Sequence, residues 1–118
     1  MKRDPDLIRR ICFAVEDAPA NEYIQELDGI DPETFAGHVA LMIDAGLVIG
    51  AVTPLTGVTR AHVERLTWDG HDFADAARSD TLWKKAKEEV IRPGASWTFD
   101  LLKEWLKAEI SNGFPTFR

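Results

Sequence analysis

Apolar residues recur at helical spacing along the first segment of the chain, residues 4–18. They fall at three- and four-residue intervals and therefore share one helix face: Leu7, Ile8, Ile11, Cys12 and Val15. Asp4 suits the N-cap because its carboxylate can accept hydrogen bonds from the first turn. Pro5 suits the first helical position because it lacks an N–H that would go unpaired there. The pattern predicts a helix over this segment.

The same combination of a cap and a proline predicts a second helix, which starts at Asp31 and Pro32. Its apolar residues again lie on one face: Phe35, Val39, Met42 and Ile43. Gly46 ends this helix, because glycine adopts the left-handed conformation found just after helix termini. Residues 23–27, between the two helices, are predicted to form a short, weakly patterned strand.

Two runs rich in apolar and β-branched residues follow the second helix, at residues 47–53 and 61–67. They predict an antiparallel hairpin whose tip is formed by the seven residues 54–60. Thr67 can cap a third helix over residues 68–78, and two further helices are predicted over residues 79–91 and 98–110. Helices combined with one small antiparallel sheet define an α+β protein.

The last predicted helix has more apolar surface than one packing contact uses. The residues chosen as candidates for contact are Phe99, Leu102, Trp105 and Leu106. An apolar band of this width indicates a helix that is buried on two sides or that meets a partner. Two interpretations follow: the helix closes the core of the domain, or two copies of the chain pair through it as a homodimer.

The order of these elements resembles that of a winged-helix domain. Residues 38–47 end the second helix in the pattern H-x-x-x-x-x-x-A-G-L, and residues 66–70 open the third in the pattern L-T-x-x-G. Both patterns recur on either side of the wing hairpin in that class. The resemblance implies a winged-helix-like domain over residues 1–78. The helices predicted in residues 79–118 are expected to form an extension that packs on this domain.

A second resemblance is narrower. The chain opens with M-K-R-D-x-D-L-I-R and later contains L-T-W-x-G-H-D-F (residues 66–73) and D-T-x-W (residues 80–83). These runs resemble an uncharacterised family of short bacterial, phage and prophage proteins that is classed as a domain of unknown function. The resemblance covers residues 1–87. It implies a phage association and carries over no catalytic or binding residue.

The distribution of charge disfavours DNA binding by the second helix. The net charge is −6, and residues 21–50 contain six acidic residues and no basic one. Winged-helix domains usually place this helix in the major groove, where Lys and Arg neutralise phosphates. We therefore expect a basic protein partner to bind the exposed residues of this helix: Glu33, Thr34, His38 and Asp44. The alternative is a DNA-binding transcriptional regulator that uses Arg60 and Arg65 of the hairpin.

No combination of residues points to catalysis. The three histidines lack the spacing of a metal site, and Cys12 has no second cysteine to pair with. Neither a glycine-rich phosphate loop nor a nucleophile motif is present. With 118 residues and no apolar run long enough to cross a bilayer, the chain is expected to be cytoplasmic. The sequence predicts a non-enzymatic, phage-associated interaction module without metal or cofactor.

Overall fold

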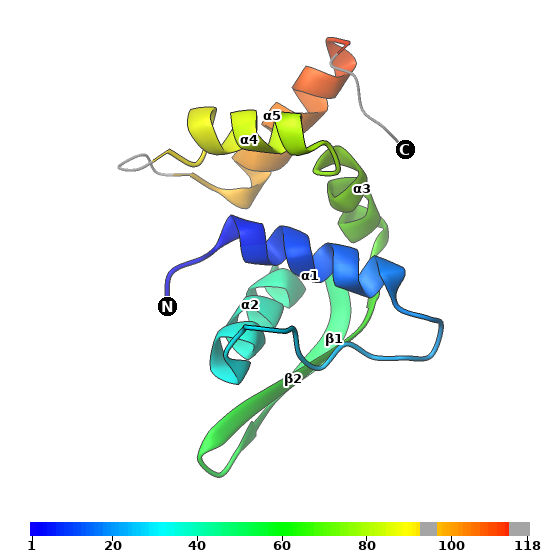
Figure 1. Cartoon of the computed structure of the whole chain (residues 1–118), viewed down its shortest axis with the longest axis vertical. Coiled ribbons are helices and arrows are strands. Elements are labelled where there is room, and N and C mark those ends of the chain that lie inside the picture. Colours follow the sequence, from blue (N-terminus) through cyan, green and yellow to red (C-terminus); the bar gives the residue numbers. More distant parts are fainter. Residues whose placement is uncertain (93–96, 114–118) are drawn as a thin grey trace. The chain divides into compact units, whose positions relative to one another are not determined.

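The computed structural model describes residues 1–92 and 97–113 of the chain (Figure 1). These residues form five helices and one two-stranded antiparallel sheet, which confirms the α+β class. The chain divides into two compact units, Met1–His71 and Asp72–Arg118. The packing of the helical extension, residues 79–118, on residues 1–78 stays a prediction. The elements in chain order are α1 (Pro5–Asp17), α2 (Pro32–Asp44), β1 (Val48–Leu55), β2 (Val58–Leu66), α3 (Trp68–Ala76), α4 (Asp80–Glu89) and α5 (Phe99–Ser111).

The first two helices begin where the sequence predicts. The Asp4 carboxylate accepts two backbone N–H groups from the first turn of α1, and Pro5 is the first helical residue. Asp31 accepts the N–H of Thr34 at 3.1 Å at the start of α2. After the end of α2, Gly46 has the left-handed φ of +74°. Both caps and the predicted terminator are therefore confirmed.

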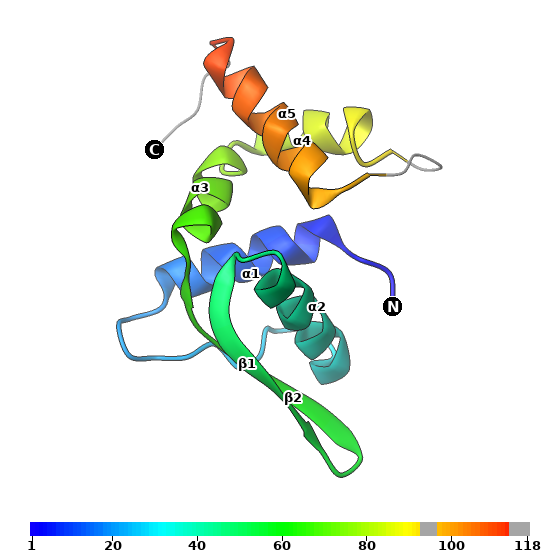
Figure 2. The same cartoon turned by 180° about the vertical axis from the view of Figure 1, so that it is seen from behind.

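The core of the unit Met1–His71 lies between α1, α2 and the inner face of the hairpin, which run beside one another in Figures 1 and 2. The predicted apolar face of α1 is buried along its whole length. Each buried side chain contributes about 1.5–3 kcal/mol relative to its exposed state. The largest contributors from the other elements are Phe35, Val39, Met42, Leu47 and Val63, all at most 1% exposed.

The hairpin is longer than the sequence predicts. Its strands stay paired as far as Leu55 and Val58, so the tip is a two-residue turn and not the seven residues 54–60. Gly57 has φ +79° and supplies the positive φ that such a tight turn requires. Pro54 is tolerated within β1 because it lies opposite Thr59 at a non-hydrogen-bonded position, where its missing N–H would point away from β2.

The strand predicted at residues 23–27 is reduced to a single bridge. Ile24 exchanges two backbone hydrogen bonds with Val63, at 3.0 and 2.8 Å, and residues 25–27 then leave the sheet. The divergence has a local cause: the turn at residues 28–29, where Gly29 has φ +76°, carries the chain to the cap of α2 at Asp31. The bridge makes β2 the central strand at this one position.

The unit Asp72–Arg118 has its own aromatic cluster. Phe73 meets the ring of Trp83 edge-on, with centroids 6.1 Å apart, and packs at 4.9 Å against Phe99. On α4, the side chains of Leu82, Trp83 and Ala86 are buried, and α4 packs against α5. Among the described residues, no helix combines the length and apolar character that crossing a bilayer requires.

Candidate functional site

The exposed surface of α2 is acidic and has no cation. Glu33 and Asp44 are exposed, Thr34 is half-buried, and the helix contains neither Lys nor Arg. We call these three residues the acidic face of α2. The other partly accessible positions of the helix are small or apolar: Gly37, Ala40, Leu41 and Ile43. The carboxylates of Glu33 and Asp44 are unfavourable for contact with a phosphate backbone, but that this helix does not bind DNA stays a prediction.

His38 does not belong to the acidic face, and the expectation that it is exposed is wrong. Its side chain is only 1% exposed. The backbone N–H of Asp4 donates to its Nε2 at 2.9 Å, while its Nδ1 lies 2.9 Å from the carbonyl oxygen of Thr34. Because an N–H can only donate and a carbonyl can only accept, the ring is neutral and carries its proton on Nδ1. His38 therefore ties α2 to the start of α1, an arrangement that helical periodicity does not reveal.

The L-T-x-x-G pattern at residues 66–70, which follows the hairpin, also has a structural role. The Thr67 hydroxyl donates to the carbonyl of Gly46 at 2.5 Å and accepts the N–H of Gly70 at 3.0 Å. A Cβ on Gly70 would collide with the carbonyl oxygen of Leu47. Both residues are needed where α3 begins against the end of α2, so the pattern L-T-x-x-G is explained by packing and capping.

Arg60 and Arg65, the candidates for nucleic acid, lie on β2 and are both exposed. Between them, His62 stacks on the ring of Tyr23, with centroids 5.3 Å apart and planes 13° apart. His62 also lies 3.3 Å from the carboxylate of Glu64. The outer face of the hairpin thus mixes two cations with an aromatic pair and an acidic side chain.

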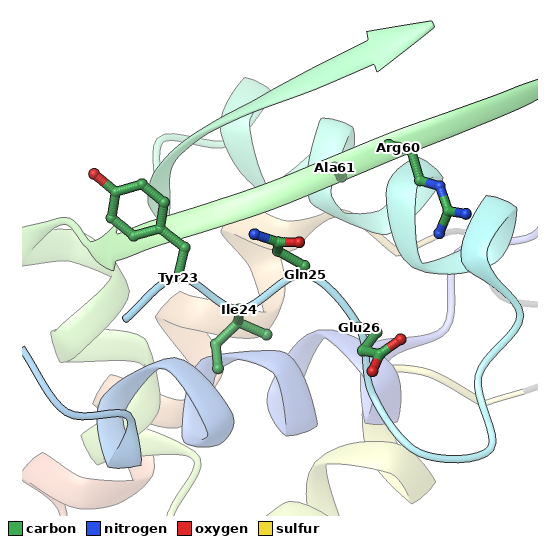
Figure 3. A pocket seen from close by; sticks show the side chains of 6 residues that line it. All are labelled: Tyr23, Ile24, Gln25, Glu26, Arg60 and Ala61. Atoms are coloured by element: carbon green, nitrogen blue, oxygen red, sulfur yellow. The ribbon is translucent and has the colours of Figure 1, made fainter. Parts of the chain in front are cut away.

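A groove opens where residues 25–27 diverge from β2 (Figure 3). Its volume is about 620 Å³. We call it the edge groove, and it is lined by Tyr23, Ile24, Gln25, Glu26, Arg60 and Ala61. In Figure 3 the side chains of Glu26 and Arg60 lie on opposite sides of the gap. The groove is not evident from the sequence, because residues 23–27 are only weakly patterned and nothing in them indicates where they leave β2.

The four residues proposed for the contact of α5 fall into two groups. Leu102 and Leu106 are at most 1% exposed, which is the property that closing a core requires. Phe99 and Trp105 are partly accessible, and the ammonium groups of Lys103 and Lys85 lie 5.9 Å from their respective ring centroids. Leu101 is 51% exposed on the same helix. Pairing of two copies through α5 stays a prediction.

The groups that could carry chemistry are few in the described part of the chain. Cys12 is fully buried, and desolvation, followed by the nearby charge of Glu16, raises its pKa from 9.0 to about 12. A thiol in this state is a poor nucleophile at neutral pH. His71 is half-exposed and lies 3.8 Å from the carboxylate of Glu16, and the described residues contain no group of three or more potential metal ligands.

Comparison with known proteins places the chain in a family. It belongs to the family described as "Hypothetical protein (DUF2513)", whose model matches residues 2–96. A relative from Haemophilus influenzae, described as "Uncharacterized protein", is 30% identical over 114 residues, which cover 94% of this chain and 97% of the relative. No solved structure matches the chain. Membership in an uncharacterised family is therefore confirmed, and its function is open.

Proposed function

We propose that this protein is a non-enzymatic interaction module with a winged-helix-like domain, and that it binds a basic protein partner through the acidic face of α2. The phage or prophage association implied by the sequence resemblance, and a cytoplasmic location, are parts of the same proposal. The observation that carries it is the exposed surface of α2, which presents two carboxylates and no cation where a DNA-binding helix needs Lys and Arg.

The roles of the motif residues support a module without catalysis. His38, Thr67 and Gly70 are held in backbone hydrogen bonds or tight packing between helices. Side chains used in this way position elements of the fold and are not free to bind a substrate. The surface available for recognition is then formed by residues outside the motifs, with Glu33 and Asp44 as its charged members.

Charge reversal tests the proposal. The double variant Glu33→Lys with Asp44→Lys is expected to lose the partner that the tagged wild-type chain captures from host extract, measured by quantitative mass spectrometry. The changes at the two ends of α2 have opposite interactions with the helix dipole, so the fold should be little affected. The matched control is Glu88→Lys with Glu104→Lys, which changes the net charge equally at exposed sites on α4 and α5. If the two double variants capture the partner equally well, the acidic face of α2 is rejected as the binding surface.

The second candidate function is DNA binding through the hairpin, and it is favoured by the exposure of Arg60 and Arg65 on β2. A winged-helix regulator would use such residues to contact phosphates beside its binding helix. Selection of random duplex DNA on the full chain should then enrich a sequence motif, and Arg60→Ala should weaken binding about equally for all sequences. Failure to enrich a motif at low salt would exclude this function.

A further inference from the structure

Within residues 1–92 and 97–113, the outer edge of β2 is unpaired beyond its bridge to Ile24. The peptide groups of a strand point alternately to its two sides. Both groups of Val63 point away from β1, because they bond to Ile24. The peptide groups of Ala61 and Thr59, two and four residues away, therefore point to the same side. In the described residues, neither has a backbone partner there.

The turn of the hairpin gives the same alternation independently. In a two-residue hairpin, the residues that close the turn form a hydrogen-bonded pair, here Leu55 and Val58. Counting along the register, Arg60 and His62 are then bonded to β1, whereas Thr59 and Ala61 are not. Two separate features of the structure thus assign the same peptide groups to the open edge.

This open edge is partly shielded from water at Ala61, which is 8% exposed. If β-pairing continued from the bridge, Glu26 would lie opposite Ala61, but residues 25–27 leave the sheet and the edge groove occupies the gap. In the described part of the chain, the peptide groups of this edge face the groove without a protein partner, so a segment that supplies donors and acceptors here is bound with a backbone contribution. The groove runs along the strand edge, as Figure 3 shows, and this suits an extended chain.

Charge determines which extended chain fits best. Glu26 is the carboxylate among the groove's lining residues. Glu22 and Asp28 are close to it along the chain and are both exposed, and Arg10 donates to the backbone carbonyl of Asp28 at 2.8 Å. Arg60 is the single cation among the groove's lining residues. Neither Glu26 nor Arg60 forms an ion pair within the described residues. Together with the neighbouring residues, three carboxylates (Glu22, Glu26 and Asp28) face two cations (Arg10 and Arg60), and this small acidic excess favours a segment with basic side chains.

We propose that an extended, basic segment of a partner protein adds to the outer edge of β2 as a further strand, with its backbone bonded to Thr59 and Ala61 and a Lys or Arg beside Glu26. This inference rests on the proposed function and specifies the binding mode. Peptide binding by strand addition draws affinity from main-chain hydrogen bonds and specificity from alternate side chains.

Amide exchange tests the mode directly. Peptides selected from a random twelve-residue display library on the full chain are synthesised and added to isotope-labelled protein. The N–H groups of Thr59 and Ala61 should exchange slowly only with peptide present. Those of Arg60 and His62, which point to β1, serve as internal controls and should be protected in both states. The enriched peptides should be rich in Lys or Arg.

Two pairs of variants refine the test. Thr59→Pro removes one edge donor and should weaken peptide binding about tenfold or more, whereas Thr59→Ala keeps the donor and should bind within about twofold of wild type. Glu26→Lys should weaken binding, and the charge control Glu104→Lys should not. If Thr59→Pro fails to fold, N-methylation along the peptide replaces it, and sensitivity at every second amide is the expected sign of strand pairing.

Other outcomes overturn the inference. Protection of Thr59 and Ala61 that appears with rising protein concentration and no peptide would identify a second copy as the occupant. Peptides that bind with unchanged affinity to Thr59→Pro, but not to the double variant of Glu33 and Asp44, would place binding on the acidic face of α2. In that case strand addition fails and the proposed function stands. Absence of any enriched peptide also rejects strand addition, while capture of a folded partner still tests the proposed function separately.

Discussion

Replacing His38 tests whether this motif residue holds the fold together. The variant His38→Leu keeps an apolar side chain of similar size but leaves the N–H of Asp4 without its acceptor. An unsatisfied, partly buried donor costs about 1–3 kcal/mol. Loss of the bond to the carbonyl of Thr34 adds about 0.5–1.5 kcal/mol. We therefore expect the free energy of unfolding to fall by about 2–4 kcal/mol.

The variant His38→Gln is the matched control. Its side-chain oxygen can reach the position of Nε2 and accept the N–H of Asp4, so the expected loss is about 1 kcal/mol. Unfolding is followed in urea by residue-resolved NMR signals of α1 and α2, because the chain has two compact units and a global probe would mix them. Faster exchange of the Asp4 amide in His38→Leu is the expected local effect.

Two results would refute this account of His38. A stability of His38→Leu within about 0.5 kcal/mol of wild type would show that the link between α1 and α2 contributes nothing measurable. Equal losses in the Leu and Gln variants would show that packing alone matters and that the acceptor for Asp4 does not. Either result would reject the hydrogen bond from Asp4 to His38 as a stabilising feature of the fold.

Three further predictions concern packing, the thiol and assembly. Gly70→Ala should lower stability in urea by about 1–3 kcal/mol, although alanine favours helices, because its Cβ meets the carbonyl of Leu47; a more stable variant would contradict this. Burial raises the pKa of Cys12 from 9.0 to about 12, so the unfolded state loses its thiol proton first and stability should fall as pH rises above 9, by up to about 1.4 kcal/mol per unit. In urea titrations from pH 8 to 10.5, Cys12→Ala should not show this pH-dependent loss of stability. Identical pH profiles of the variant and the wild type would reject the contribution of the Cys12 thiol. If α5 pairs two copies, light scattering should report twice 13.2 kDa and Leu101→Lys should reduce it to the monomer, whereas a wild-type monomer would exclude the dimer.

The sequence was sufficient for the features that depend on neighbours along the chain. Asp4 with Pro5, and Asp31 with Pro32, mark the starts of α1 and α2 because a cap bonds to residues two or three positions away. The buried face of α1 follows from spacing alone, since side chains three and four residues apart share one side of a helix. The absence of cations from α2 is likewise a property of the sequence.

Tertiary structure decided the features that depend on which segments meet. His38 falls near the edge of the apolar face of α2. It is buried where α2 meets the start of α1 and accepts the N–H of Asp4, 34 residues away, and no local sequence pattern contains this contact. Trp68 has a large apolar side chain of the kind usually found in protein cores, but it is 83% exposed. Its position at the start of α3 is set by the hydrogen bonds of Thr67 with Gly46 and Gly70. The open edge at Ala61 exists because the turn to α2 draws residues 25–27 away from β2. Capping and periodicity are short-range interactions and can be inferred from sequence, whereas burial, register and open strand edges are fixed only when distant segments compete for the same neighbours.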